Sequence, residues 1–263
     1  MIEVAHSRQR RLSQKMGYLF TVARLLFRAN LRSRRRRTFL GYFWLAIPGI
    51  AFAVAFSVLR KGDLLTVGKM DMPYPLFVLS GVFLWQTFVD ALSTPTQKLV
   101  EQRRFLSLVP APFEAVLLAA MGEVMLNLAV RLSILLLAML AFGVGPQISW
   151  LFIPLAGVSI LAAGFVLGLF AAPFAQLYDD VASLVGMTAT FGIFLVPVFY
   201  PIPTHSWLDL NPLAWPLVAL RDAIMGDVNF ARALWLFFGS ALLMIPALLF
   251  NSVSRPHIAA RAY

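Results

Sequence analysis

The sequence contains no cysteine and few charged residues. Without cysteine among its 263 residues, the chain has no disulfide, no thiolate metal ligand and no cysteine nucleophile. Charged residues make up 13% of the chain, roughly half the usual share of a soluble domain, whereas hydrophobic residues make up 60%. A chain of this composition cannot cover itself with a water-facing surface, so we predict a membrane protein.

Motifs for soluble chemistry are also missing. The sequence has no GxxxxGK[ST] phosphate loop, no GxSxG nucleophile elbow and no HExxH zinc motif. The three histidines, His6, His205 and His257, lie far apart in the sequence. We therefore predict that the chain is not an enzyme and binds no metal, nucleotide or other cofactor by itself.

Six apolar runs are long enough to cross a membrane, since a transmembrane helix needs about 20 largely apolar residues. The predicted spans are residues 38–59, 73–97, 113–142, 149–177, 181–200 and 233–253. Gly143–Pro146 separates the third span from the fourth, because Gly and Pro favour a turn. The predicted fold is an all-α membrane protein, with a basic cytoplasmic N-terminus (residues 1–37) before a six-helix transmembrane domain (residues 38–263).

The basic residues predict the orientation of the chain. With a cytoplasmic N-terminus, six spans place both termini and the loops at residues 97–112 and 178–180 on the inner side. Of the 22 Lys and Arg residues, sixteen then lie inside and five outside, with Arg131 within the membrane. Cytoplasmic loops carry an excess of Lys and Arg, so both termini are predicted to be cytoplasmic.

Two further segments are amphipathic but are not predicted to span. The first, Gln14–Ser33, has an arginine at every fourth residue of its second half and is otherwise largely apolar. Such a helix is predicted to lie in the membrane interface. The second, Pro212–Met225, follows a good N-cap residue, Asn211, and reaches only about 20 Å as a helix. We predict a short periplasmic re-entrant or gate helix there.

Four arginines, Arg34–Arg37, come directly before the first span. Near an anionic lipid surface each contributes about 1 kcal/mol, so the run can serve as a topology signal. It can also hold an anionic substrate head group, such as a lipid pyrophosphate, at the cytoplasmic mouth. The substrate entrance would then comprise Arg24, Arg28, Arg32, Arg34, Arg35, Arg36 and Arg37. Nucleic-acid binding is the weakest alternative, because the run adjoins a span.

Charged residues inside predicted spans are costly, which makes them candidate functional residues. Glu123, Asn127 and Arg131 recur every four residues and therefore share one face of the third span. Either pairing between helices or a substrate path accounts for this face. Asp90 is predicted to reach the cytoplasmic end of the second span.

Aromatic residues gather near the predicted ends of the spans. They are Tyr42, Phe43, Trp44, Trp85, Phe88, Trp207 and Trp215. A belt of aromatic side chains at the membrane interface is the usual reason for such a distribution. Because sugars stack on aromatic rings, a channel lining is the alternative.

Four segments resemble one family of membrane transporters. Residues 35–48, RRRTFLGYFWLAIP, resemble the entry to the first span in ABC-2-type permeases that export polysaccharide, O-antigen, capsule or teichoic acid. Residues 197–201, PVFYP, and 211–226, NPLAWPLVALRDAIMG, are similar to the fifth-span exit and the periplasmic gate segment of that family. Residues 105–119, FLSLVPAPFEAVLLA, are similar to its cytoplasmic connection into the third span. With the six-span plan, the resemblance covers nearly the whole chain.

The resemblance implies a transport subunit that works with a separate engine. It implies a homodimer of this chain with two copies of a cytoplasmic ATP-binding subunit, which supplies the site for ATP and Mg. The implied activity is the export of a lipid-linked glycan across the bacterial inner membrane. Membrane lipids are further implied partners, whereas nucleic acid is not.

Two groups of candidate site residues follow from the spans and the resemblance together. The candidate channel and gate residues are Tyr42, Trp44, Glu123, Arg131, Phe199, Tyr200, Trp207, Trp215 and Arg221. The candidate contacts with the ATPase are Lys98, Glu101, Arg103, Arg104, Phe105, Leu106, Asp179 and Asp180. The family usually has an Arg-Asp pair in its second cytoplasmic loop, where this chain has Asp179-Asp180. If that arginine contacts the ATPase, the contact must differ or be lost here.

Other functions remain open at this point. An exporter of teichoic acid, of a small lipid or of a drug would share the pattern. An ATP-independent secondary transporter would normally show inverted repeats and broken helices in corresponding halves, and the sequence shows no such symmetry. A membrane transferase would need a cluster of acids or histidines at one membrane face, and nothing basic or nucleophilic accompanies Asp179-Asp180.

Overall fold

The computed structural model describes residues 2–37, 41–62, 72–105, 112–178, 180–201 and 207–260. Within these ranges the chain is helical and has no β-strand. The α-helices are α1 (Ile2–Arg37), α2 (Ile47–Lys61), α3 (Tyr74–Phe105), α4 (Phe113–Ala141), α5 (Ile153–Leu177), α6 (Asp180–Phe191), α7 (Ala214–Met225) and α8 (Ala231–Ala260). The 3-10 helices are η1 (Gly41–Leu45), η2 (Ile148–Phe152), η3 (Gly192–Phe194) and η4 (Trp207–Leu210).

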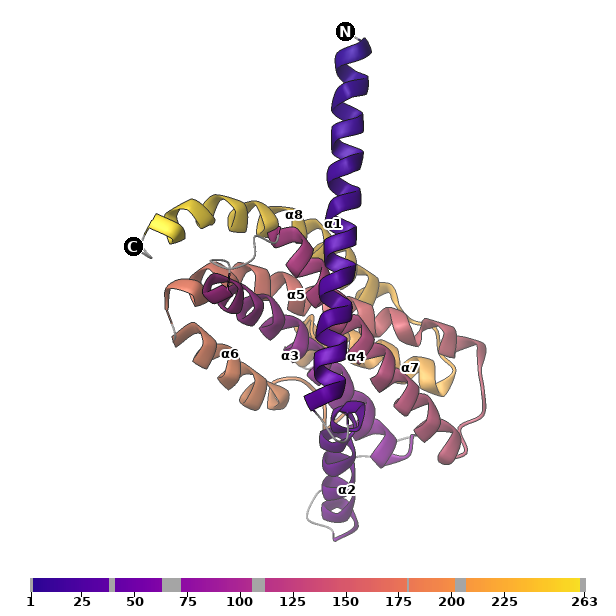
Figure 1. The fold of residues 1–263 in the computed structure, drawn as a ribbon. Coiled ribbons are helices and arrows are strands. Elements are labelled where there is room, and N and C mark those ends of the chain that lie inside the picture. Colours follow the sequence, from indigo (N-terminus) through magenta and orange to yellow (C-terminus); the bar gives the residue numbers. More distant parts are fainter. Residues whose placement is uncertain are drawn as a thin grey trace.

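Five helical segments in the described part of the chain are long and apolar enough to cross a membrane. They are Tyr42–Lys61, Tyr74–Glu101, Phe113–Ala141, Ile148–Leu177 and Ala231–Ser254. Each coincides with a predicted span to within a few residues. In Figure 1 the C-terminal ends of α3 and α8 and the α5–α6 turn lie toward one side of the bundle. The α4–α5 connection lies on the opposite side, as expected for consecutive antiparallel spans.

The segment predicted as a span at residues 181–200 does not form one long helix. α6 ends after 12 residues, which gives about 18 Å of helix and is too short to cross the hydrocarbon. Gly192 lies against Trp85, where a Cβ would come within 2.6 Å of the indole. Turns follow η3, and Pro197 has no N–H with which to continue a helix. The hydropathy of the segment does not predict this break in the helix, because the residues after the break are as apolar as those before it.

α1 is one continuous helix and extends beyond both ends of the amphipathic segment predicted at residues 14–33. Figure 1 shows that it runs across α3, α4 and α5 instead of alongside them, with its N-terminal part projecting past them. It packs on α4 through Phe27, which covers Gly122 so closely that a Cβ there would lie 3.3 Å from the ring. The Asn30 side-chain amide also donates a hydrogen bond to Glu123 of α4.

α3 and α5 form the centre of the molecule. Most residues of their apolar stretches are buried, whereas most of those in α2, α4 and α8 are not. The backbones approach closely at Gly164 and Gly168, where an added Cβ would lie 2.6 Å from the Phe88 carbonyl oxygen and 2.4 Å from that of Leu92. Small residues four positions apart are a common way for membrane helices to come into backbone contact. The sequence GFVLG therefore sets the spacing of the central pair.

α8 packs on α5 at a proline. Pro173 lies inside α5 and has no N–H to donate to the carbonyl of Leu169, four residues earlier. Asn251 of α8 donates to that carbonyl at 2.7 Å through Nδ2, and also to its own helix at the Ala247 carbonyl at 2.8 Å. The buried amide therefore satisfies the acceptor that the proline leaves open.

Candidate functional site

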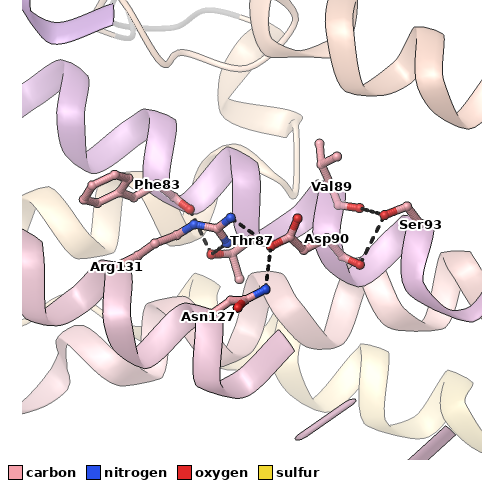
Figure 2. A network of polar contacts seen from close by, with 7 residues as sticks. All are labelled: Phe83, Thr87, Val89, Asp90, Ser93, Asn127 and Arg131. Atoms are coloured by element: carbon pink, nitrogen blue, oxygen red, sulfur yellow. Dashed lines mark hydrogen bonds and ion pairs between the residues drawn. The ribbon is translucent and has the colours of Figure 1, made fainter. Parts of the chain in front are cut away.

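A polar network joins α3 and α4 within their apolar parts, as Figure 2 shows. The Arg131 guanidinium donates to the Asp90 carboxylate at 2.8 Å and to the Thr87 hydroxyl at 3.2 Å. Asn127 donates to the same Asp90 oxygen at 3.3 Å. Thr87 passes its own hydrogen on to the Phe83 carbonyl at 2.8 Å. Two residues of α4 thus hold one carboxylate of α3.

Burial explains why the pair is needed. The Arg131 side chain is only 4% exposed and that of Asp90 is 31% exposed. A charge in apolar surroundings is costly unless an opposite charge and hydrogen bonds compensate it. Since each charge compensates the other, the network fixes the position of α4 along α3.

Glu123 lies one turn before Asn127 on the same face of α4 but contacts α1, through Asn30. A small crevice opens where α1, η1 and α4 meet, and its lining residues are Asn30, Leu31, Tyr42, Glu123, Leu126 and Asn127. The face of α4 that the sequence singled out therefore pairs with α3 at one end and with α1 at the other. Of the two interpretations left open, the structure shows pairing between helices.

The prediction that Asp90 reaches the cytoplasmic end of its span was wrong. Its carboxylate turns toward α4, where Arg131 and Asn127 each donate a hydrogen bond to it (Figure 2). Arg131 and Asp90 are 41 positions apart, so no local spacing reveals the pair. Two opposite charges in consecutive apolar runs are the sequence signal that could have found it. Thr87 carries no such signal.

Arg221, a candidate gate residue, is buried in α7. Its guanidinium donates through Nη1 to the Pro197 carbonyl at 2.8 Å and through Nη2 to the Val198 carbonyl at 2.9 Å. α7 lies outside the five candidate spans. Burial lowers the pKa of Arg221 to about 9 and Asp222 opposes this shift, so the guanidinium stays charged at neutral pH.

Phe199 and Tyr200 follow the carbonyls that Arg221 binds. Phe199 is buried and stacks on Phe56 of α2, with 4.1 Å between the ring centroids. The Tyr200 hydroxyl donates to the Phe194 carbonyl at 3.0 Å. These aromatic side chains pack on the end of η3 and on α2.

The other aromatic candidates are dispersed. Trp215 donates through Nε1 to the Asp209 carbonyl at 2.9 Å, which ties α7 to η4. Tyr42 lies in the crevice beside α1, whereas Trp44 is 54% exposed. The side chain of Trp207 lies outside the described residues. The described aromatic candidates therefore do not form one continuous lining within a single chain.

The entrance arginines lie along α1. Arg24, Arg28 and Arg32 are exposed and form the basic stripe that their spacing predicts. Arg34–Arg37 belong to the last turn of α1, and their side chains lie outside the described residues. Ala23 and Phe27 lie on the α4 side, so the described arginines are turned away from the helix bundle.

The candidate ATPase contacts at residues 98–105 are the last turns of α3 and not a separate helix, because the helical hydrogen bonds of the second span continue through them. Lys98 and Glu101 form an exposed ion pair at 3.2 Å. Arg103, Arg104 and Phe105 follow in the last turn, with side chains outside the described part. Leu106 and Asp179 lie wholly outside it, and Asp180 is exposed at the start of α6. Among the described residues, no cluster of His, Asp and Glu could hold a metal ion.

Comparison with known proteins shows similarity over most of the chain. Residues 21–225 match the ABC-2 type transporter family. The chain is also similar to two curated proteins of Klebsiella pneumoniae, each named "O-antigen export system permease protein RfbA". One is 22% identical over 252 residues and the other 23% identical over 256 residues. Each alignment covers 92% of this chain and 96% of the relative.

Proposed function

Because the chain belongs to the ABC-2 type transporter family, we propose that it is the permease subunit of an ATP-binding-cassette exporter of a lipid-linked polysaccharide. The substrate is of the O-antigen or capsular type, and it crosses the inner membrane. The observation that carries this proposal is the end-to-end similarity to two O-antigen export permeases. The absence of a phosphate loop from the sequence supports a transport role that depends on a partner for ATP hydrolysis.

The proposed complex holds two copies of this chain and two copies of a cytoplasmic ATP-binding subunit. Both termini of the permease lie in the cytoplasm and α1 lies in the membrane interface. α6, with the turns after it, makes a sixth, interrupted passage through the membrane. α7 is re-entrant on the outer side, since its 12 residues are too few for a crossing.

The arginine run before the first span is proposed to concentrate the anionic substrate at the cytoplasmic interface. Replacing Arg34–Arg37 by glutamine is expected to lower export by at least about tenfold, because four arginines together contribute up to about 4 kcal/mol near an anionic surface. Replacement by lysine keeps the charge and serves as the matched control. Export is measured in cells alongside the amount of inserted protein. Wild-type export by a correctly inserted glutamine variant would leave the run with only a topological role.

The end of α3 is proposed to contact the ATPase. Replacing Phe105 and Leu106 by alanine is expected to weaken co-purification of the ATPase about 30-fold, because an apolar anchor in a protein groove often contributes about 2 kcal/mol. Charge reversal, Arg103→Glu with Arg104→Glu, is expected to uncouple ATP hydrolysis from export even where the complex survives.

The experiment co-expresses the permease with a candidate ATPase and measures complex recovery, ATP hydrolysis and export in parallel. Phe142→Ala is the matched truncation, since Phe142 is exposed just after the opposite end of α4. Unchanged values for all variants would exclude a coupling role for this end of α3. Failure to find any ATPase that co-purifies with the wild-type chain would exclude the proposed function itself.

A further inference from the structure

Arg221 is a buried cation whose hydrogen bonds all go to backbone carbonyls. Besides the carbonyls of Pro197 and Val198, it donates through Nη2 to the Phe77 carbonyl of α3 at 3.3 Å. Its guanidinium lies over the Phe77 ring, 3.4 Å from the centroid. None of the ion pairs among the described residues includes Arg221. Backbone oxygens and one aromatic face therefore make the direct contacts with the charge, and the neighbouring Asp222 also favours the charged form.

These carbonyls need a donor because the helix has broken. Pro197 and Val198 follow η3 in an irregular segment, so no regular helical N–H reaches their oxygens. Both residues are well inside the protein, and Val198 is fully buried. A buried carbonyl without a donor costs about 1–3 kcal/mol, so the guanidinium stabilises two such groups at once.

α3 closes around the same segment. The Tyr74 hydroxyl donates to the Phe199 carbonyl at 3.0 Å, next to the two carbonyls that Arg221 binds. At Gly81 an added Cβ would lie 2.8 Å from Arg221 Nη2 and 3.0 Å from the Val198 carbonyl oxygen. Three consecutive carbonyls, of residues 197–199, are therefore held by side chains from α7 and α3. We call these residues the anchored segment.

α6, directly before the anchored segment, is packed quite differently. None of its side chains is buried. Near its end, Trp85 Nε1 of α3 donates to the Ala189 carbonyl at 3.1 Å. A lightly packed helix attached to a firmly held segment can change its angle while the segment keeps its place.

We propose that Arg221 is a positioning residue: it fixes the anchored segment to α3 and α7, so that α6 moves during export on a fixed base. This inference rests on the proposed function, because it assigns the movement of α6 to export. The attachment of the anchored segment to α3 and α7, which we call the fixed base, depends on this chain alone. It can therefore be tested without substrate or ATPase.

The test uses a cysteine at Val198, in a chain that has no native cysteine. A membrane-impermeant maleimide is added to spheroplasts that expose the outer face of the inner membrane. Val198→Cys is expected to react slowly with Arg221 present and at least tenfold faster in Arg221→Met. Arg221→Lys keeps a charged donor and is expected to restore most of the protection. Val228→Cys, at an exposed position near the end of α7, is the labelling control and is expected to react equally in all backgrounds.

Gly81→Ala provides a second route, since it displaces the guanidinium without removing the charge. It is expected to raise the reactivity of Val198→Cys, whereas Gly186→Ala, where a Cβ meets no atom within 4 Å, is expected to leave it unchanged. If Arg221→Met does not insert, Gly81→Ala decides. Protection of Val198→Cys in every inserted variant would overturn the proposal.

Export then separates positioning from general stability. In inserted Arg221→Met or Gly81→Ala, complex recovery and ATP hydrolysis are expected to stay near wild type while export falls about tenfold, and Arg221→Lys is expected to restore most of the export. An equal fall of all three would show only a structural role and overturn the positioning role. Absence of an ATPase partner would defeat the proposed function but leave the labelling result, and hence the fixed base, intact.

Discussion

Arg131→Met is expected to destabilise the protein by about 3 kcal/mol, the scale on which a charge left in the membrane interior raises the free energy. The variant removes the partner at 2.8 Å from the Asp90 carboxylate and keeps the weaker hydrogen bond from Asn127 at 3.3 Å. The hydroxyl of Thr87 also loses the donor at 3.2 Å. Unfolding of the detergent-solubilised protein, followed by heat or by SDS, measures the loss.

A double-mutant cycle identifies the cause. Asp90→Asn with Arg131→Met removes both charges, so its loss of stability is expected to be about 2 kcal/mol less than the sum of the two single variants. Arg232→Met is the control, because Arg232 and Asp209 form an exposed pair at 3.5 Å that contributes at most about 1 kcal/mol. Additive losses in the cycle would mean that the two charges do not stabilise each other.

Gly168→Val is expected to cost about 3 kcal/mol or to prevent folding, because the central helices would have to separate. Its Cβ would lie 2.4 Å from the Leu92 carbonyl oxygen and 3.1 Å from Pro95 Cδ. Neither atom belongs to a flexible side chain, so no rotamer change relieves the clash. Thermal unfolding in detergent and the yield of inserted protein measure the effect.

Two matched substitutions complete this experiment. Gly164→Ala meets the Phe88 carbonyl oxygen at 2.6 Å and is also expected to destabilise. Gly239→Ala in α8 meets no atom within 4 Å, and alanine favours a helix over glycine by about 1 kcal/mol, so a small gain in stability is expected. If Gly168→Val were as stable as Gly239→Ala, the close approach of α3 and α5 would be wrong.

The apolar helices could largely be predicted from the sequence because hydropathy is a local property. Tyr74–Glu101 and Ile148–Leu177 coincide with predicted spans because each is one long apolar run. Residues 181–200 were predicted to be one helix, yet α6 ends just before Gly192, which lies against Trp85, more than a hundred positions earlier in the sequence. A contact between segments that are distant in the sequence does not change the hydropathy averaged over a local window.

The polar contacts were predictable only in part. The spacing of Glu123, Asn127 and Arg131 correctly placed them on one face of α4, because that depends on helix geometry alone. Their partners, Asn30 and Asp90, depend on how whole helices pack. The contacts of Arg221 could not be predicted from the sequence, because its partners are backbone carbonyls. Every residue has a backbone carbonyl, so no sequence motif marks these partners.

α3 is a single helix of 32 residues, which at 1.5 Å per residue is about 48 Å long, well beyond the roughly 30 Å of the hydrocarbon. Along this one rod lie the Phe77 carbonyl, the Asp90 carboxylate and the Lys98–Glu101 pair. Pro95 lies inside this helix and cannot donate to the carbonyl of Ala91, so we expect α3 to bend most easily there. The ten residues beyond it form a lever of about 15 Å, so a bend of about 10° displaces its tip by about 3 Å. The stiffness of α3 at Pro95 thus decides how a displacement of one end of the helix acts on the other end. A stiff helix transmits the displacement across the membrane, whereas a flexible one bends at Pro95.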